Sequence, residues 1–158
     1  MMAELDINLV LIDVPQCEAG ASSPIIVADD EIMVFGYSIQ NSQVEAARNS
    51  VAIIRVESCF IHKFGAPNDE ALHGHPYTRF GLKPYNGYEV LQSDWVRDLI
   101  AANRVHHRHL DSLFSDHRHF IFAFQDSTLE FVTSSDLAIK EATGNVGDVV
   151  VSEFLQRT

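Results

Sequence analysis

Two histidines separated by a single residue, His73 and His75, are the pair in this sequence best suited to metal chemistry. In an extended segment, side chains two residues apart project to the same side, so both imidazoles can bind one metal ion. Asp69 and Glu70 lie just upstream and offer carboxylate oxygens as further ligands. The alternative is a turn at His75-Pro76 in which the imidazoles form hydrogen bonds with loop carbonyls.

A second histidine cluster, which contains His106 and His109, follows a predicted helix. If these two imidazoles face His73 and His75 across a cleft, the four side chains form a site for a divalent metal ion. The alternative requires no metal, because cationic side chains at the C-terminal end of a helix interact favourably with the helix dipole.

Glu130 is the third candidate, because its carboxylate interrupts a strand rich in aromatic residues. A carboxylate in such a strand is exposed, paired or functional. We therefore predict Glu130 and His75 as catalytic residues of a pocket under the 63–88 loop. Four further residues are predicted to bind the ligand: Arg79, Tyr77, Asp69 and Glu70.

The stretch 119–133 must position Glu130, and its alternation predicts two strands of a β-hairpin. One face of this hairpin is almost wholly aromatic and is predicted to lie on a core. That face carries Phe120, Phe122, Phe124, Leu129 and Phe131.

The register of the hairpin decides which side chains lie near Glu130. With a two-residue loop at Asp126-Ser127, Glu130 pairs with Ala123. His119 then lies about 13 Å from Ala123 along its strand. The sequence therefore predicts that His119 and Glu130 do not share a metal ion, and that a partner for Glu130 comes from another element.

The remaining patterns predict a single domain that spans residues 1–158. The fold class is α+β: a bent, mainly antiparallel sheet or partly open β-barrel, with one principal helix packed on it and the 63–88 loop over one end. Whether residues 143–158 form helix or strand stays open. The predicted elements are strands at 7–14, 24–28, 32–39, 51–62 and 88–91, a loop or single helical turn at 40–50, a helix at 94–105 capped by Ser93, and a short helix at 136–142.

The charge balance argues against two classes of partner. Lysine and arginine number 11 against 22 acidic residues, which gives a formal net charge of -11. Such a surface repels nucleic-acid phosphates and anionic lipid head groups, so neither nucleic acid nor a membrane is the expected partner. The N-terminal apolar run lacks the basic residues of a signal peptide, and a cytoplasmic location is therefore expected.

Three stretches together resemble a family of small uncharacterised bacterial proteins: NDEALHGHP, NRVHHRH and HFIFAFQDSTLEF. The resemblance covers roughly residues 65–133 and implies that these stretches belong to one module. It carries over no established activity or catalytic residue. Members of the family have histidine where this chain has Gln125, so the resemblance implies no site at that position here.

Two functions of different class follow from these residues. The first is a soluble small-molecule-binding protein, or a metal-dependent enzyme, whose pocket is lined by histidines and carboxylates under the 63–88 loop. The second is a non-catalytic protein that binds a protein partner or associates with itself as a homo-oligomer through aromatic residues of that loop. The sequence leaves open whether the protein is an enzyme.

Overall fold

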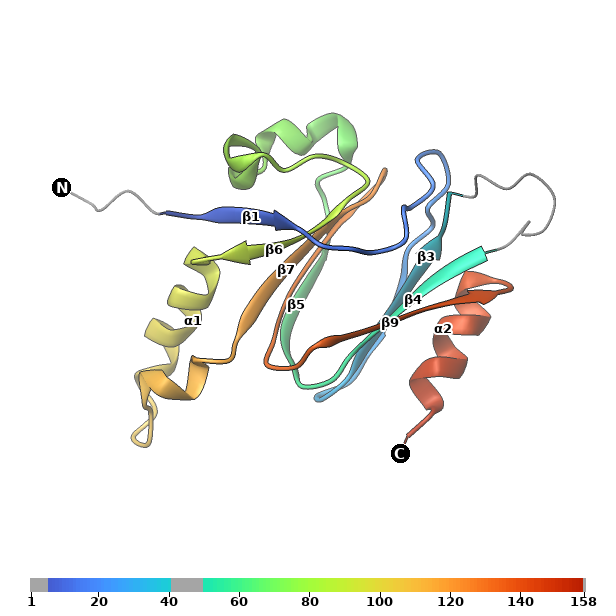
Figure 1. Ribbon diagram of the computed structural model, residues 1–158. Helices are drawn as coiled ribbons and strands as arrows, with labels where there is room; N and C mark the ends of the chain where they lie inside the picture. Colours follow the sequence, from blue (N-terminus) through green and yellow to red (C-terminus); the bar gives the residue numbers. More distant parts are fainter. Residues whose placement is uncertain (1–5, 41–49, 158) are drawn as a thin grey trace.

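The computed structural model describes residues 6–40 and 50–157, and it consists of two antiparallel sheets with a few helices (Figure 1). Both sheets are open, which confirms the predicted α+β class with bent, mainly antiparallel sheets. The prediction for residues 40–50 falls almost wholly outside the described residues. The five-stranded sheet has the order β1 (Asn8–Leu11), β6 (Gly87–Leu91), β7 (Arg118–Ala123), β8 (Thr128–Thr133), β5 (Cys59–Gly65), and the four-stranded sheet has the order β2 (Ile25–Ala28), β3 (Met33–Ser38), β4 (Ser50–Val56), β9 (Leu137–Thr143).

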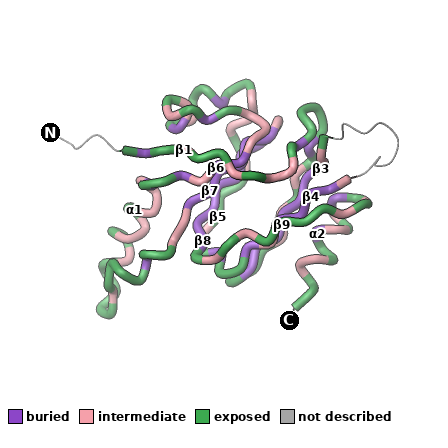
Figure 2. Tube along the Cα trace, in the orientation of Figure 1, coloured by how far each residue is buried: buried purple, intermediate pink, exposed green. Residues whose placement is uncertain are grey.

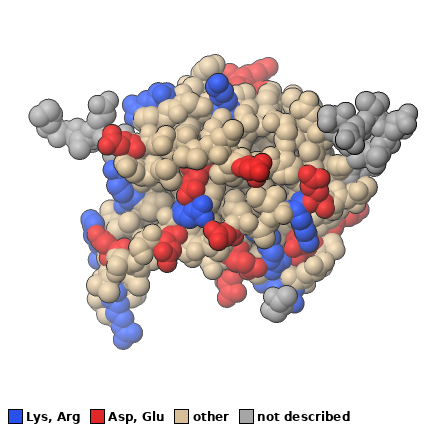
Figure 3. Space-filling view, in the orientation of Figure 1, with Lys and Arg blue, Asp and Glu red and all other residues tan. Residues whose placement is uncertain are grey.

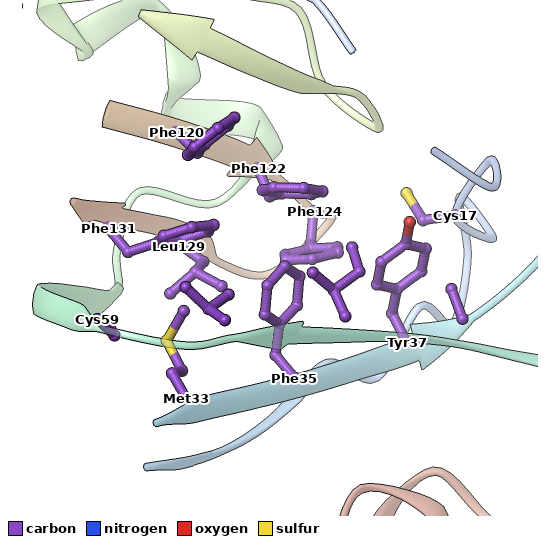
Figure 4. Packing of buried hydrophobic residues seen from close by; sticks show 13 residues of the cluster. Cys17, Met33, Phe35, Tyr37, Cys59, Phe120, Phe122, Phe124, Leu129 and Phe131 are labelled. Atoms are coloured by element: carbon purple, nitrogen blue, oxygen red, sulfur yellow. The ribbon is translucent and has the colours of Figure 1, made fainter. Parts of the chain in front are cut away.

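The main core lies between the two sheets. The rings of Phe122 and Phe131 on the five-stranded sheet meet the ring of Phe35 on β3, at centroid distances of 5.0 and 5.7 Å. Figure 4 shows the phenylalanines of β7 and β8 directed towards Met33, Phe35 and Tyr37, and Figure 2 shows burial along the central strands of both sheets. The predicted burial of the aromatic face of the hairpin is therefore confirmed.

The predicted single strand at 51–62 is wrong. The segment forms two strands, β4 and β5, which belong to different sheets. The chain reverses at Glu57-Ser58, where Ser58 has a positive φ of 49°. Apolar residues alternate through this turn, so the sequence pattern does not reveal that one strand ends and another begins there.

The helix predicted at 136–142 is also wrong, because this segment is β9 and pairs antiparallel with β4. Its alanine, lysine and glutamate residues favour helix in isolation. Seven paired positions with β4 outweigh that local preference.

Two α-helices lie beside different sheets (Figure 1). α1 (Asp94–Asn103) begins at the predicted Ser93 cap, whose Oγ accepts a hydrogen bond from the Val96 N–H at 3.1 Å. α2 (Val146–Leu155) resolves the open prediction for the C-terminal segment as helix, and its buried Val150 packs with Val34 and Ile53 on the four-stranded sheet.

Charged side chains of both signs are dispersed over the face shown in Figure 3. Among the helices that the structure describes, none combines the length and apolar character needed to cross a bilayer.

Candidate functional site

The hairpin places Glu130 beside His119, in contrast to the predicted register. Phe124 N–H donates to the Ser127 carbonyl at 2.8 Å, so the two-residue loop is Gln125-Asp126, one residue earlier than predicted. Moving the loop by one residue shifts the pairing by two, and Glu130 therefore lies opposite Ile121. The side chain of His119 is then a diagonal neighbour of Glu130 on the same face.

Glu130 is the centre of the site, and it is 4% exposed. Oε2 accepts a hydrogen bond from His119 Nε2 at 2.8 Å, and Oε1 accepts one from His75 Nε2 at 2.9 Å. The ammonium group of Lys63 lies 3.5 Å from Oε1. We call Glu130, His75 and His119 the carboxylate cluster.

The cluster holds Glu130 in its ionised form. Burial alone raises the pKa of a carboxyl group, but the hydrogen bonds from His119 and His75, together with the nearby positive charge of Lys63, outweigh burial and lower the pKa of Glu130 from 4.5 to about 2. An ionised carboxylate only accepts hydrogen bonds, so both imidazoles must present an N–H to it.

Hydrogen bonds on the far side of each ring fix the two tautomers. His75 Nδ1 accepts the backbone N–H of Tyr77 at 3.1 Å, so the ring proton of His75 lies on Nε2. His119 Nδ1 lies 2.8 Å from Ser93 Oγ, which already accepts the Val96 N–H. The ionised carboxylate of Glu130 requires the ring proton of His119 on Nε2, so Nδ1 of the neutral ring is the acceptor and the Ser93 hydroxyl donates to it.

Two 3-10 helices bring His75 to Glu130. η1 (Asp69–Gly74) and η2 (Pro76–Phe80) follow β5, and His75 lies between them as the C-cap of the first and the N-cap of the second. Tyr77 follows on η2, and its buried hydroxyl donates a hydrogen bond to Asp94 at the start of α1. This contact joins the 63–88 loop to α1.

The indole of Trp95 packs against the cluster. Its ring meets the His119 ring edge to face, with centroids 5.0 Å apart. The Lys63 ammonium group lies 4.3 Å from the centre of the same indole. A cation over an indole face is attracted to it, so Trp95 helps to hold Lys63 beside Glu130.

Two open depressions are lined by residues of the carboxylate cluster, and they share no lining residue. The first, here the Lys63 depression, has a volume of about 340 Å³. It is lined by Lys63, residues 64–66, His75, Pro76, Thr128 and Glu130. The second, here the Ser93 depression, has a volume of about 510 Å³ and is lined by Ser93, Arg97, His117, Arg118, His119 and residues of β6.

The four predicted metal-binding histidines do not come together. His73 is exposed on η1, because the segment forms 3-10 helix and not the extended strand that would align it with His75. His106 is exposed, and His109 Nε2 is hydrogen-bonded to Asp111 Oδ1 at 2.6 Å. Within residues 6–40 and 50–157, no group of three or more His, Cys, Asp or Glu is arranged to hold a metal ion.

The predicted ligand-binding residues also separate. Tyr77 lies within the site, with its ring centroid 5.0 Å from that of His75. Asp69 accepts a hydrogen bond from the Tyr85 hydroxyl, and Glu70 is exposed. The guanidinium of Arg79 lies over the Phe80 ring and does not line either depression.

Three features of the site were not predicted: Lys63, His119 as a partner of Glu130, and the hydrogen bond between Ser93 and His119. The Ser93 cap was predicted, but its contact with His119 depends on how β6 and β7 pair. Lys63 pairs with Glu130 across β5 and β8, and that pairing is long-range. His119 would have been found if the hairpin loop had also been tested one residue earlier.

The depressed pKa of Glu130 predicts a specific loss of stability in acid. The folded-state pKa is lower than the ordinary value of 4.5, so the ionised group stabilises the fold above that value, and the stabilisation is lost as the pH falls from 4.5 towards 2. Between pH 6 and pH 3, the wild type should lose about 2 kcal/mol more unfolding free energy than Glu130→Gln. Urea denaturation of both proteins at each pH measures this difference, and an equal loss in the two proteins would contradict the ionised state.

Comparisons of this chain with models of protein families, with curated proteins and with solved structures found no match, and the resemblance to a family of small bacterial proteins therefore stays a prediction.

Proposed function

We propose that this protein binds a small polar molecule in the Lys63 depression, next to the carboxylate cluster. The observation that carries the proposal is the ionised, 4% exposed carboxylate of Glu130, held by two imidazoles at the edge of an open depression. Taking a carboxylate out of water costs free energy, and such groups are concentrated at functional sites. The 63–88 loop contributes His75 to this site, as the small-molecule hypothesis requires.

The charges near the depression favour an oxygen-bearing ligand over a metal cation. The side chain of Lys63 is 57% exposed, so its ammonium group can donate to a ligand while it stays near Glu130. A metal cation at Glu130 Oε1 would be repelled by this ammonium group, which lies 3.5 Å away. A carboxylate, phosphate or carbonyl oxygen of a small molecule is the matching partner.

A titration of the ¹⁵N-labelled full chain with acetate, inorganic phosphate and a set of fragment-sized carboxylic acids tests the proposal. Binding should shift the amide signals of Gly65, Ala66 and Thr128, which line the depression. Lys63→Ala should weaken this binding by at least about tenfold, because a charged hydrogen bond is lost.

Lys83→Ala is the matched control, because Lys83 is an exposed lysine outside the Lys63 depression. It should leave the titration unchanged. Shifts that map to other surfaces, or binding that survives Lys63→Ala, would refute the Lys63 depression as the site.

One observation favours self-association as a second candidate. β5 is an edge strand of the five-stranded sheet, and its Phe60 and Phe64 are 50% and 47% exposed. Sedimentation velocity over a hundredfold range of concentration tests this candidate. A sedimentation coefficient that rises with concentration, and no longer rises in Phe64→Ser, would support it, and a constant monomer value would refute it.

A further inference from the structure

Ser93, His119 and Glu130 form a continuous chain of hydrogen bonds at the Ser93 depression. The Ser93 hydroxyl donates to His119 Nδ1 at 2.8 Å, and His119 Nε2 donates to Glu130 Oε2 at 2.8 Å. The imidazole is buried completely and the carboxylate almost completely. The hydroxyl thus faces the accepting nitrogen of a ring whose other nitrogen is oriented by an ionised carboxylate.

This order of groups is that of a nucleophile, a general base and an orienting acid. In serine hydrolases the base removes the hydroxyl proton, and the carboxylate holds the ring in the required tautomer and stabilises the imidazolium that forms. Here the two ring nitrogens have exchanged roles, since Nδ1 faces the hydroxyl and Nε2 faces the carboxylate. The tautomer that the cluster imposes on His119 is the one in which Nδ1 can accept a proton.

The backbone around Ser93 is a tight strand-to-helix turn. β6 ends at Leu91, Gln92 has a positive φ of 54°, and α1 begins at Asp94. A positive φ at a residue other than glycine is uncommon and is found at turns and functional sites. The turn places Ser93 at the positive end of the α1 dipole, which favours negative charge on its oxygen.

The capping role of Ser93 alone would not explain this arrangement. An N-cap serine needs only its bond to the helix, which the Val96 N–H supplies at 3.1 Å. The bond to His119, the buried carboxylate behind it and an open depression of about 510 Å³ that contains both Ser93 and His119 are independent of capping.

We infer that Ser93 is the nucleophile of an acyl-transfer site in the Ser93 depression, with His119 as general base and Glu130 as its positioning residue. The substrate class is a carboxylic ester with a small acyl group. Arg97 and Arg118 line the same depression, but Arg118 is paired with Glu89, which also lines it, so Arg97 is the side chain expected to bind an anionic group of the substrate. The Ser93 depression shares no lining residue with the Lys63 depression, where we propose the ligand site.

Ester hydrolysis at this site would proceed in two steps. Ser93 Oγ bonds to the carbonyl carbon while its proton passes to His119 Nδ1; the carbon–oxygen bond to the alcohol then breaks, and that proton passes to the leaving alkoxide. A water molecule next gives one proton to Nδ1 and bonds through oxygen to the acyl carbon. The bond from the acyl carbon to Ser93 breaks, the proton returns to Ser93 Oγ, and the carboxylic acid leaves.

A fluorophosphonate reagent tests the inference on the full chain. Ser93 Oγ would bond to phosphorus as the phosphorus–fluorine bond breaks, fluoride leaves and the hydroxyl proton passes to His119. Intact mass and peptide mapping of the folded wild type should show one modification, on Ser93. Ser93→Ala should not be modified, and Ser115→Ala, which removes an exposed serine, should react like the wild type.

Glu130→Gln separates a catalytic role from a capping role. The glutamine oxygen can accept the His75 N–H, but its amide group would then face His119 as a second donor. His119 has to move its proton to Nδ1 and donate to Ser93, so labelling should slow by at least about tenfold while the Ser93 cap persists. Absence of label on the folded wild type, label on another residue, or an unchanged rate in Glu130→Gln would overturn the inference.

The two proposals can fail separately. Ligand binding is read from the amide shifts of Gly65, Ala66 and Thr128, which line the Lys63 depression and not the Ser93 depression, whereas acyl transfer is read from the covalent label on Ser93. Labelling without ligand binding would refute only the proposed function, and ligand binding without labelling would refute only the acyl-transfer site.

Discussion

Replacing Phe122 by alanine should lower the free energy of unfolding by about 4 kcal/mol. Phe122 is 2% exposed, and its ring meets the Phe35 ring edge to face between the two sheets. Deleting the ring removes buried apolar surface and leaves a cavity that surrounding strands cannot easily fill, because both sheets are held by their own hydrogen bonds. Urea denaturation at pH 7 measures the change.

Phe64→Ala is the matched control for this prediction, since it deletes the same ring from the same sheet. Phe64 is 47% exposed on β5, and its loss should cost less than about 1 kcal/mol. Similar losses for the two variants would show that the aromatic face of the hairpin is not the main source of stability.

Replacing Glu130 by alanine should cost about 3 kcal/mol. The change removes the acceptor of two buried N–H groups, those of His75 and His119, and leaves both without a partner. Glu130→Gln should cost only about 1 kcal/mol, because its oxygen still accepts from His75 and His119 can move its proton towards Ser93. Chemical denaturation of the three proteins at pH 7 measures this order.

Glu70→Ala serves as the control for a carboxylate outside the cluster. Glu70 is exposed on η1, and its replacement should change the stability by less than about 0.5 kcal/mol. If Glu130→Ala is as stable as the wild type, the carboxylate cluster does not hold the loop and the sheet together.

The burial of the hairpin face could be predicted although its register could not. Alternation of Phe120, Phe122 and Phe124 assigns a face, and an error of two residues in pairing leaves every side chain on its own face. The loop position was uncertain because Gln125, Asp126 and Ser127 all suit turns. Because of this ambiguity of one residue in the loop, the predicted pairing places His119 far from Glu130. In the structure the two side chains are hydrogen-bonded.

The sequence contains a signal against an extended segment at His73 and His75, namely the start of a helical segment at Asn68. Asn68 caps η1 by accepting the Ala71 N–H at 3.0 Å, and two acidic residues follow it in the first turn. This is the usual start of a helical segment, and it predicts that His73 and His75 do not align. The prediction that His75 and Glu130 lie in one site relied instead on the need of a buried carboxylate for a partner, and they lie 2.9 Å apart.

The partners that complete the site could not be predicted, because they depend on pairing between distant strands. Lys63 reaches Glu130 through the β5–β8 pair, and Ser93 reaches His119 because β6 and α1 lie beside β7. No local pattern specifies these pairings, since each strand has apolar residues that suit several neighbours.

A long-range ¹H–¹⁵N correlation spectrum of the histidine rings tests the carboxylate cluster most directly. At pH 7, the ring protons of His75 and His119 should both lie on Nε2, and Glu130→Gln should move only the His119 proton to Nδ1. A wild-type His119 with its proton on Nδ1, or a Glu130→Gln spectrum identical to that of the wild type, would contradict this prediction.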